Sequence, residues 1–291
     1  MGTATSDVSG LLLVDKPAGI TSHDVVAIVR RVVGSQRVGH TGTLDPFATG
    51  LLVVLVGRGT RLIPYIDGEP KVYDATIRFG SETDTDDATG QTTRESDVPE
   101  DAAIEVAIAK LTGAIDQVPP SYSAKKVAGT RAYAAARRGI ALDLEPSRII
   151  VHRWELGSRA GADIAARLTC SGGTYIRALA RDLGRLTNSA AHLAALRRVR
   201  SGCFVVDDAY TLEQLRAGDS KMQPLRDAIP SIPTRRLAEP ELTRVLHGNA
   251  IVANGEPLAS RVALIDDEKA LVAVAEREGD ELRPKLVLRD V

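Results

Sequence analysis

Apolar residues follow two different spacing patterns along this chain. In the first, they form short unbroken runs or alternate with polar residues, as is typical of buried and half-buried β-strands. The stretch at residues 71–79 alternates throughout, so one face of that strand should be buried and the other exposed to solvent. Strands are predicted on this basis at residues 11–14, 51–56, 71–79, 149–156 and 165–170.

In the second pattern, apolar residues recur every three or four positions, which predicts amphipathic helices. The first of these helices can be capped by Thr21 or Ser22 and stopped by Gly34, and the pair Gly172 and Gly173 precedes a later one. Helices are predicted at residues 24–33, 100–111, 131–138, 175–186, 190–199 and 212–217.

Glycine, proline and charged residues fill the segments in between. Residues 37–50 are predicted to be a loop, and residues 80–91 an acidic loop. The basic, turn-rich segment at 119–148 has the composition of a surface insertion. Three prolines within residues 222–233 predict a linker, and the last ~60 residues alternate short strands with turns, which predicts a small β-rich domain.

The length and composition of the chain favour one large domain and one small domain. Its 291 residues are 44% apolar, which is enough to fill a substantial core, and we expect domains at residues 1–225 and 226–291. The N-terminus lacks the basic and apolar blocks of a secretory signal, and the apolar runs are far shorter than the ~20 residues that span a bilayer. Cys170 and Cys203 have no CxxC neighbour and are expected to be small buried side chains. A cytoplasmic protein with no membrane partner is therefore expected.

Charge becomes informative when the chain is divided. The net charge is −1, yet residues 65–120 contain 13 acidic and 4 basic residues, whereas residues 121–200 contain 15 basic and 5 acidic ones. Most of the basic residues are arginine, whose planar fork suits phosphates and base edges. Two interpretations stay open at this point: a surface that binds a polyanion, or ordinary solvated faces of an arginine-rich protein.

Several kinds of site can be set aside. The five histidines form no HxxxH or HxH pair, so a zinc site is not expected. The string SETDTDDATG departs from the calcium-loop pattern at two positions and is interpreted as a solvated turn, with a hydrolase using Asp84 and Asp86 kept as a minor alternative. GRGT after a strand completes no phosphate-loop motif, and GxSxG is absent.

The loop RVGHTGTLDPFATG contains more side chains that can hydrogen-bond or react than a turn requires. Asp45 precedes a proline, which is common in turns. However, a histidine and two threonines lie within five residues of Asp45, and the surrounding glycines allow a ligand to approach the backbone. A carboxylate in such a place can serve as a nucleophile or a base, provided that a cation keeps it ionised.

Five motifs of the sequence resemble those of the TruB family of tRNA pseudouridine synthases, in the same order along the chain. GHTGTLDPFATGLL resembles the catalytic loop of this family, LLLVDKPAGITSHDVV its opening motif and KVYDATIRFGSETDTDDATG its second motif. QVPPSYSAKKVAGTRAYAAARRG is similar to the insertion that grips RNA. CSGGTYIRALARDLG with HLAALRRVRSG is similar to the third motif. LHGNAI and LRPKLVL resemble, more loosely, the small PUA-like RNA-binding domain at the C-terminus.

This resemblance implies both a fold and an activity. The implied fold is α+β, with a mixed, largely antiparallel central sheet flanked by helices and loops, followed by a small β-rich PUA-like domain. The implied activity is isomerisation of the T-loop uridine of tRNA, position 55, to pseudouridine by base flipping. The reaction is redox-neutral and implies no metal and no cofactor, and tRNA is the expected partner of a monomeric enzyme. A non-catalytic protein that binds or folds tRNA on the same scaffold is the alternative.

The resemblance also assigns residues. Asp45 matches the catalytic aspartate, Arg177 its ion-pair partner, and Tyr73 the tyrosine that stacks on the target base and is associated with proton transfer. Whether Asp45 attacks C1′ or the pyrimidine ring stays open. The implied substrate-binding residues are Tyr73, His40, which fills the stack left by the flipped base, Tyr175 and Leu196 in the uridine pocket, the largely structural Lys16, and Lys125, Lys126 and Arg131 of the insertion.

Overall fold

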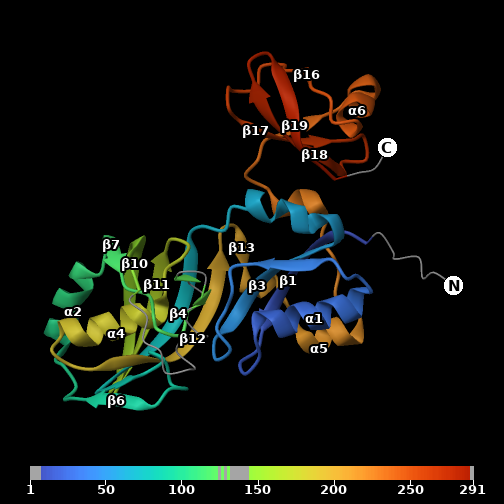
Figure 1. Cartoon of the computed structure of the whole chain (residues 1–291). Coiled ribbons are helices and arrows are strands. Elements are labelled where there is room, and N and C mark those ends of the chain that lie inside the picture. Colours follow the sequence, from blue (N-terminus) through green and yellow to red (C-terminus); the bar gives the residue numbers. More distant parts are fainter. Residues whose placement is uncertain (1–7, 124–125, 128–129, 132–143, 289–291) are drawn as a thin grey trace.

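Two β-sheets organise the chain, whose computed structural model describes residues 8–123, 126–127, 130–131 and 144–288 (Figure 1). The larger sheet runs in the order β14-β1-β3-β12-β4-β11-β10-β7, with β2 beside β3 and β13 beside β12. Its strands are β1 (Gly10–Lys16), β2 (Val38–Thr41), β3 (Thr49–Val56), β4 (Lys71–Phe79), β7 (Gly113–Gln117), β10 (Ser147–Ala160), β11 (Asp163–Cys170), β12 (Ala191–Ser201), β13 (Phe204–Val205) and β14 (Tyr210–Thr211).

Neighbouring strands of this sheet are antiparallel except for two pairs. β1 runs parallel to β14, and β3 runs parallel to β12. The second of these pairs joins the two halves of the sheet, because β3 belongs to the N-terminal half and β12 pairs on its other side with β4. The predicted mixed, largely antiparallel sheet is confirmed.

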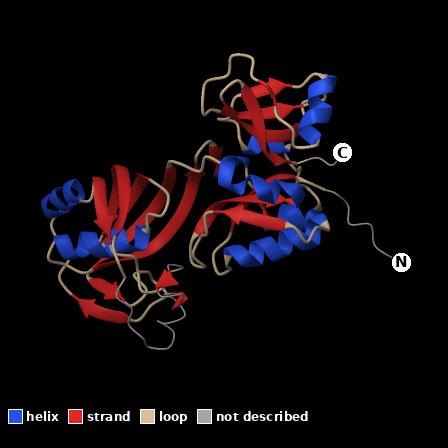
Figure 2. Cartoon of the chain, turned by 45° about the horizontal axis from the view of Figure 1, so that its top comes forward, coloured by secondary structure: helices blue, strands red, loops and turns tan. Residues whose placement is uncertain are grey.

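Helices cover the two halves of the sheet separately (Figures 1 and 2). α1 (Ser22–Val33) and α5 (Leu212–Ala217) lie together beside β1 and β3, whereas α4 (Ile176–Leu186) packs against β12 and α2 (Asp101–Lys110) lies beside α4. Short 3-10 helices lie at η1 (Gly57–Tyr65), η2 (Val206–Asp208) and η3 (Leu225–Ala228). Among the described residues, no helix is both long and apolar enough to cross a membrane.

The first helix forms as its sequence predicts. Thr21 accepts a hydrogen bond from Asp24 N, and the Asp24 side chain accepts one from Thr21 N, which makes a capping box. Gly34 ends the helix with a φ of 66°, a left-handed conformation that favours glycine. The apolar stripe is buried against the sheet, with Val25 and Val29 fully inaccessible.

The predicted helix at residues 190–199 is wrong, because these residues form β12 in the middle of the larger sheet. Alanine, leucine and arginine have good helix propensity, and this favoured a helix from sequence alone. The partners on both sides, β3 and β4, instead supply hydrogen bonds and burial that only an extended strand can use. This strand brings Leu196 to the centre of the molecule.

Two segments interpreted as connections are more ordered than predicted. Within the predicted loop at residues 37–50, β2 pairs antiparallel with β3. The predicted linker is packed rather than free, because η3 and the residues after it place Ala228, Ile229 and Ile232 in an apolar cluster. Of the two cysteines, Cys170 is buried as expected and Cys203 is exposed.

The second sheet contains five strands in the order β15-β17-β18-β19-β16 (Figure 2). The strands are β15 (Thr234–Arg236), β16 (Ile251–Val252), β17 (Arg261–Ile265), β18 (Leu271–Glu278) and β19 (Glu281–Val287), and a helix not predicted from the sequence, α6 (Glu239–Leu246), packs against them. One apolar cluster joins Leu62 and Ile229 of the larger unit to Val274 and Leu286 of the smaller one.

Smaller hairpins complete the described fold. β5 (Ser81–Thr83) pairs with β6 (Thr92–Glu95), and β8 (Lys126–Val127) pairs with β9 (Thr130–Arg131). The predicted helix at 131–138 starts at a residue of β9, and its remaining residues lie outside the described part of the chain.

Candidate active site

Asp45 lies in the loop that joins β2 to β3. Its carbonyl accepts a hydrogen bond from Ala48 N (3.1 Å), which closes a turn around the Asp-Pro step. The residue before it is fixed from both sides, because Ser22 Oγ accepts a hydrogen bond from Leu44 N (2.9 Å) and donates one to Leu44 O (3.2 Å). The loop therefore presents the Asp45 carboxylate on a backbone that is anchored to α1.

Lys16 anchors the other side of the same loop. Its side chain is fully buried at the end of β1. The ammonium donates hydrogen bonds to the carbonyls of Pro17 (2.9 Å), Ile20 (2.8 Å) and Pro46 (3.3 Å). Burial lowers the pKa of Lys16 to about 8, although the charge of nearby Asp45 opposes this effect. Because its donors are used within the protein, this geometry supports a role in fixing the catalytic loop.

Arg177 forms a two-point ion pair with Asp45. Arg177 Nε donates to Asp45 Oδ2 (2.8 Å), and Arg177 Nη2 donates to Asp45 Oδ1 (3.1 Å). The arginine side chain is only 4% exposed, whereas the aspartate side chain is 37% exposed. The guanidinium is thus held behind the carboxylate, which stays accessible from the cavity side.

The acidic loop is not the solvated turn that its composition predicts. Glu82, Asp86 and Asp87 are buried, because α4 presents arginines to them at every fourth residue. Arg181 Nη1 donates to Asp86 Oδ2 (3.0 Å), and Arg185 forms an ion pair with Glu82. Burial raises the pKa of Asp86 to about 6, although the charge of Arg181 opposes it. A turn interpretation failed here because the neutralising charges lie about ninety residues away in sequence.

Asp87 joins this network to the Asp45–Arg177 ion pair. Arg177 Nη1 lies 3.6 Å from Asp87 Oδ2 and donates to Thr85 O (2.7 Å). The other oxygen of Asp87 accepts hydrogen bonds from Thr85 Oγ1 (2.8 Å) and Thr89 N (2.9 Å). Sequence analysis did not select Asp87. The signal that could have done so is the four-residue spacing of arginines on the helix that faces the acidic string.

A cavity of about 300 Å³ opens beside Asp45 and Arg177. Tyr73 from β4, Tyr175 at the N-cap of α4 and Leu196 from β12 line it, so the structure brings these five predicted residues together. Burial raises the pKa of the Tyr73 phenol, which keeps it neutral. The cavity thus has an ion pair on one side and two aromatic rings and a leucine on the others.

Gln117 links this cavity to the start of the insertion. It is the last residue of β7 and is only 2% exposed. Its amide Nε2 donates to Tyr175 O (3.0 Å), and its Oε1 accepts from Tyr175 N (2.9 Å). Five residues later, Tyr122 O accepts a hydrogen bond from Arg177 Nη2 (3.0 Å). Sequence analysis missed Gln117, which gives no pattern of its own.

Of the remaining predicted substrate-binding residues, Lys16 and His40 do not line this cavity. His40 lies on β2, and its Nδ1 has no hydrogen-bond partner among the described residues. Burial and the charge of Arg198 lower the pKa of His40, so its ring is neutral near pH 7. Lys126 and Arg131 are cross-strand partners in the β8–β9 hairpin, whereas Lys125 lies outside the described residues.

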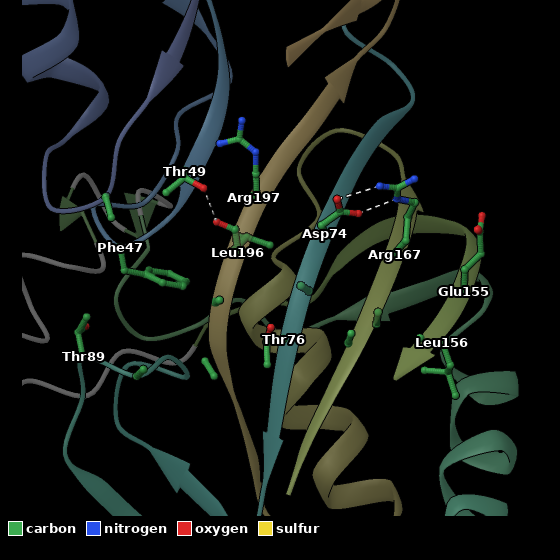
Figure 3. Close-up of a pocket in the computed structure, with 18 of the residues that line it drawn as sticks. Phe47, Thr49, Asp74, Thr76, Thr89, Glu155, Leu156, Arg167, Leu196 and Arg197 are labelled. Atoms are coloured by element: carbon green, nitrogen blue, oxygen red, sulfur yellow. Dashed lines mark hydrogen bonds and ion pairs between the residues drawn. The ribbon is translucent and has the colours of Figure 1, made fainter. Parts of the chain in front are cut away.

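A second, wider hollow lies on the face of the sheet turned away from α4 (Figure 3). Its volume is about 940 Å³, and Leu196 contributes to both hollows. The charged side chains across it are paired, since Arg167 Nε donates to Asp74 Oδ1 (2.6 Å) and Arg167 Nη2 to Asp74 Oδ2 (2.8 Å) (Figure 3). Because neither Asp45 nor Arg177 lines it, the smaller cavity is the candidate active site.

Family models and known relatives match the chain along most of its length. A model of the N-terminal domain of TruB family pseudouridylate synthases matches residues 30–176, and a model of the tRNA pseudouridylate synthase B C-terminal domain matches residues 177–233. The tRNA pseudouridine synthase B of Thermobifida fusca is 46% identical over 96% of this chain and 98% of its own length. That of Symbiobacterium thermophilum is 47% identical over 85% of this chain and 84% of its own.

One solved structure with a similar fold comes from the crystal structure of a Cbf5-Nop10-Gar1 complex. It is 26% identical, with a TM-score of 0.72, and the match covers 97% of this chain and 85% of that chain. The similarity extends across both sheets, so the fold implied by the sequence motifs is confirmed.

Proposed function

Because the chain belongs to the TruB family of pseudouridylate synthases, we propose that it isomerises one particular uridine of tRNA, at position 55 in the T loop. The coarser activity, isomerisation of uridine to pseudouridine in tRNA, is that of the family. The assignment to the T loop rests on the match between the opening, second and third motifs of the sequence and those of enzymes with this target.

The observation that carries the proposal is the buried arginine that holds an accessible Asp45 at the mouth of a small aromatic cavity. Isomerisation breaks the N1–C1′ bond, turns the base and joins C5 to C1′. A site for this reaction must hold a detached base while a carboxylate acts on the nucleotide as nucleophile or base. Asp45 supplies the carboxylate, and Arg177 holds it in place through two hydrogen bonds.

The cavity walls suit a flipped base. Unstacking a base costs about a few kcal/mol, and an enzyme offsets this by stacking the base against aromatic and apolar side chains. Tyr73 and Leu196 provide such surfaces directly beside Asp45. The neutral ring of His40, on the neighbouring strand β2, is proposed to fill the space that the base leaves in the RNA stack.

We propose that the two units of the chain have different roles, catalysis and RNA binding. Residues 1–225 would form the catalytic domain, with the insertion at about 119–148 gripping the RNA through Lys125, Lys126 and Arg131. Residues 226–291, with the five-stranded sheet, would form a PUA-like domain that binds the tRNA away from the target base. We propose a monomeric cytoplasmic enzyme that needs no metal or cofactor.

The test is to incubate the protein with unmodified tRNA in excess chelator and without added cofactor, and to map pseudouridine to single nucleotides. The proposal expects one modified position, uridine 55. Pseudouridine elsewhere in the tRNA would retain the family activity but contradict the T-loop assignment. Binding without any pseudouridine would favour the non-catalytic alternative.

Replacing Asp45 by asparagine tests its catalytic role. The amide keeps the shape of the side chain but can act neither as a nucleophile nor as a base. Turnover is expected to fall by about 10³-fold or more, with the Kd for tRNA changed by no more than about threefold. Single-turnover assays and filter binding measure the two quantities. Asp84→Asn, in the exposed part of the acidic loop, is the matched control and should leave turnover close to wild type.

A further inference from the structure

Besides Thr174 Oγ1, two polar groups in the wall of the active-site cavity have no hydrogen-bond partner among the described residues. The Oγ of Ser123 is buried and has no hydrogen-bond partner among the described residues, and the residue as a whole is 4% exposed. Lys71, the first residue of β4, lines the same cavity. Within the described chain, its ammonium is engaged in no hydrogen bond and no ion pair. Neither group takes part in the Asp45–Arg177 pair.

The position of the Lys71 ammonium follows from its packing beside Gly42. A methyl group placed on Gly42 would lie 3.2 Å from Lys71 Nζ and 3.2 Å from Arg198 Nη1, so two cations converge on this point of the catalytic loop. Gly42 has a φ of 67°, and any side chain there would be strained and would meet these charges. The loop therefore stays open on the side where Lys71 reaches the cavity.

The neighbouring charges do not neutralise Lys71. Arg198 is 1% exposed and is fixed by bonds from Nε to Leu51 O (2.8 Å) and from Nη2 to Gly42 O (2.8 Å). The nearby carboxylate of Glu69 accepts a hydrogen bond from Gly172 N (2.9 Å) and makes no ion pair with Lys71. A half-buried cation that makes no ion pair with a described residue, beside a cavity for a base, can interact with negative charge on a ligand.

The reaction supplies such a charge on the base, by either route open to Asp45. If the N1–C1′ bond breaks with its electron pair leaving on N1, the uracil becomes an anion with charge shared by N1, O2 and O4. If a nucleophile adds to C6, the electron pair moves through C5 to O4. In both cases an oxygen of the ring becomes more basic. The charge disappears when C5 bonds to C1′; the proton on C5 then passes to a base while N1 takes up a proton, and in the second route the nucleophile leaves C6.

We propose that Lys71 stabilises the negative charge that develops on a carbonyl oxygen of the uracil ring, and that Ser123 donates a hydrogen bond to the polar edge of the same ring. This inference rests on the proposed function and adds a catalytic residue to it. An ammonium can only donate hydrogen bonds, so it suits the carbonyl oxygens of uracil and opposes the exocyclic amino group of cytosine. The pair would therefore also help to select uridine.

The experiment compares Lys71→Met, Lys71→Arg and Ser123→Ala with wild type on unmodified tRNA. Removing one donor that acts on a developing oxyanion costs about 10²–10³-fold in rate. We expect a loss of this size in the single-turnover rate for Lys71→Met, a smaller loss for Ser123→Ala and partial recovery for Lys71→Arg. The Kd for tRNA should change by no more than about threefold. Lys110→Met, an exposed lysine on α2, is the control.

Other outcomes would overturn the proposal in distinguishable ways. A weaker Kd with an unchanged single-turnover rate for Lys71→Met would make Lys71 a phosphate contact. An unchanged rate and Kd would leave it without a role, while the loss of turnover in Asp45→Asn would still support the proposed function. If Lys71→Met did not fold, as judged by its melting temperature, a wild-type rate in both Lys71→Arg and Ser123→Ala would overturn the proposal.

Discussion

At the scale of single residues, buried cations shape the loop that presents Asp45. Arg198 binds the carbonyl of Gly42 on one side of the loop, and Lys16 binds the carbonyl of Pro46 on the other. Both cations bind backbone carbonyls in preference to carboxylates. A charged donor forms a stronger hydrogen bond than a neutral one, so these contacts fix the loop more firmly than neutral side chains would. Burying the Lys16 ammonium costs desolvation free energy, and this cost depends on pH because the ammonium can lose its proton.

The titration of Lys16 predicts that its contribution to the free energy of unfolding rises with pH in the alkaline range. Burial lowers the pKa of its folded-state ammonium from 10.5 to about 8. Between these two values the unfolded chain binds more protons than the folded one, so the contribution of Lys16 to the free energy of unfolding rises with pH. The gain is up to about 3 kcal/mol across this window. Over the same range the bond to Pro46 weakens, and turnover should fall.

Urea unfolding of wild type and Lys16→Met at pH 7 and pH 10 measures this effect. The difference in unfolding free energy should move in favour of the wild type as the pH rises, and Lys110→Met should show no such movement relative to wild type. A constant difference between wild type and Lys16→Met would mean that Lys16 titrates as it does in the unfolded chain.

Single residues also show how much of the candidate site could be predicted from the sequence. Asp45 and Arg177 could be paired only through the family resemblance, because 131 residues separate them and no spacing links a loop to a distant helix. Among the acids of the second motif, composition gives no reason to prefer Asp87 to Asp84 or Asp86. Only the fold shows that Asp87 lies 3.6 Å from Arg177 whereas Asp84 accepts a hydrogen bond from Gln91 N.

At the scale of elements, α4 organises the site. Arginines at every fourth residue form one stripe along it, and this stripe binds Asp45, the acidic loop and the start of the insertion. Arg181 also donates to Val118 O (2.9 Å), so two successive arginines hold the segment after β7. A helix that contacts all three segments can keep the Asp45 carboxylate in a fixed position relative to the start of the insertion.

Gln117 is the positioning residue of this arrangement. Its amide pairs with both backbone groups of Tyr175, two residues before Arg177. Gln117→Leu leaves Tyr175 N without its hydrogen bond and Tyr175 O with only the bond from Leu179 N (3.2 Å), so we expect a cost of about 1–3 kcal/mol in stability. We expect a lower melting temperature and about a tenfold lower single-turnover rate, with little change in the Kd for tRNA, because the guanidinium beside Asp45 loses its fixed position.

The variant Gln117→Glu distinguishes a role of Gln117 in positioning Arg177 from a role in the stability of the fold alone. Its carboxylate still accepts from Tyr175 N but no longer donates to Tyr175 O, and protonation of the carboxyl group at acid pH restores the donor. The rate of this variant relative to wild type should therefore recover as the pH falls. Gln91→Leu, on an exposed turn, is the control. A ratio that does not depend on pH would show that the donor to Tyr175 O is irrelevant to turnover.

Elements were predicted well where local pattern and tertiary context agree. α1 has its cap, its stripe and its stop in one short sequence, and β4 was predicted at Lys71–Phe79, the bounds that it has in the fold. β12 was missed because its residues favour a helix locally and its strand partners come from elsewhere in the chain. The part of the site that depends on β12, including Leu196, could therefore not be placed by pattern alone.

At the scale of the whole molecule, the two charged segments of the sequence neutralise each other. Acids within residues 65–120 pair with arginines within residues 121–200, as the ion pairs Arg148–Asp116, Arg159–Asp101, Arg167–Asp74, Arg177–Asp87, Arg181–Asp86 and Arg185–Glu82 show. The interpretation of the basic third as one continuous polyanion-binding surface is therefore too simple. Much of its charge is used to assemble the fold.

We propose that the insertion supplies cations for RNA, and the salt dependence of binding tests this proposal. Reversing Lys126 and Arg131 to glutamate should weaken tRNA binding and lower the slope of log K against log salt by about one for each phosphate that the protein no longer binds. Reversing Arg78, which is exposed but already paired with Asp163, is the matched control and should change the slope less. Equal effects at the two sites would mean that the RNA contacts a diffuse basic face, and that the ion pairs between the segments open when RNA binds.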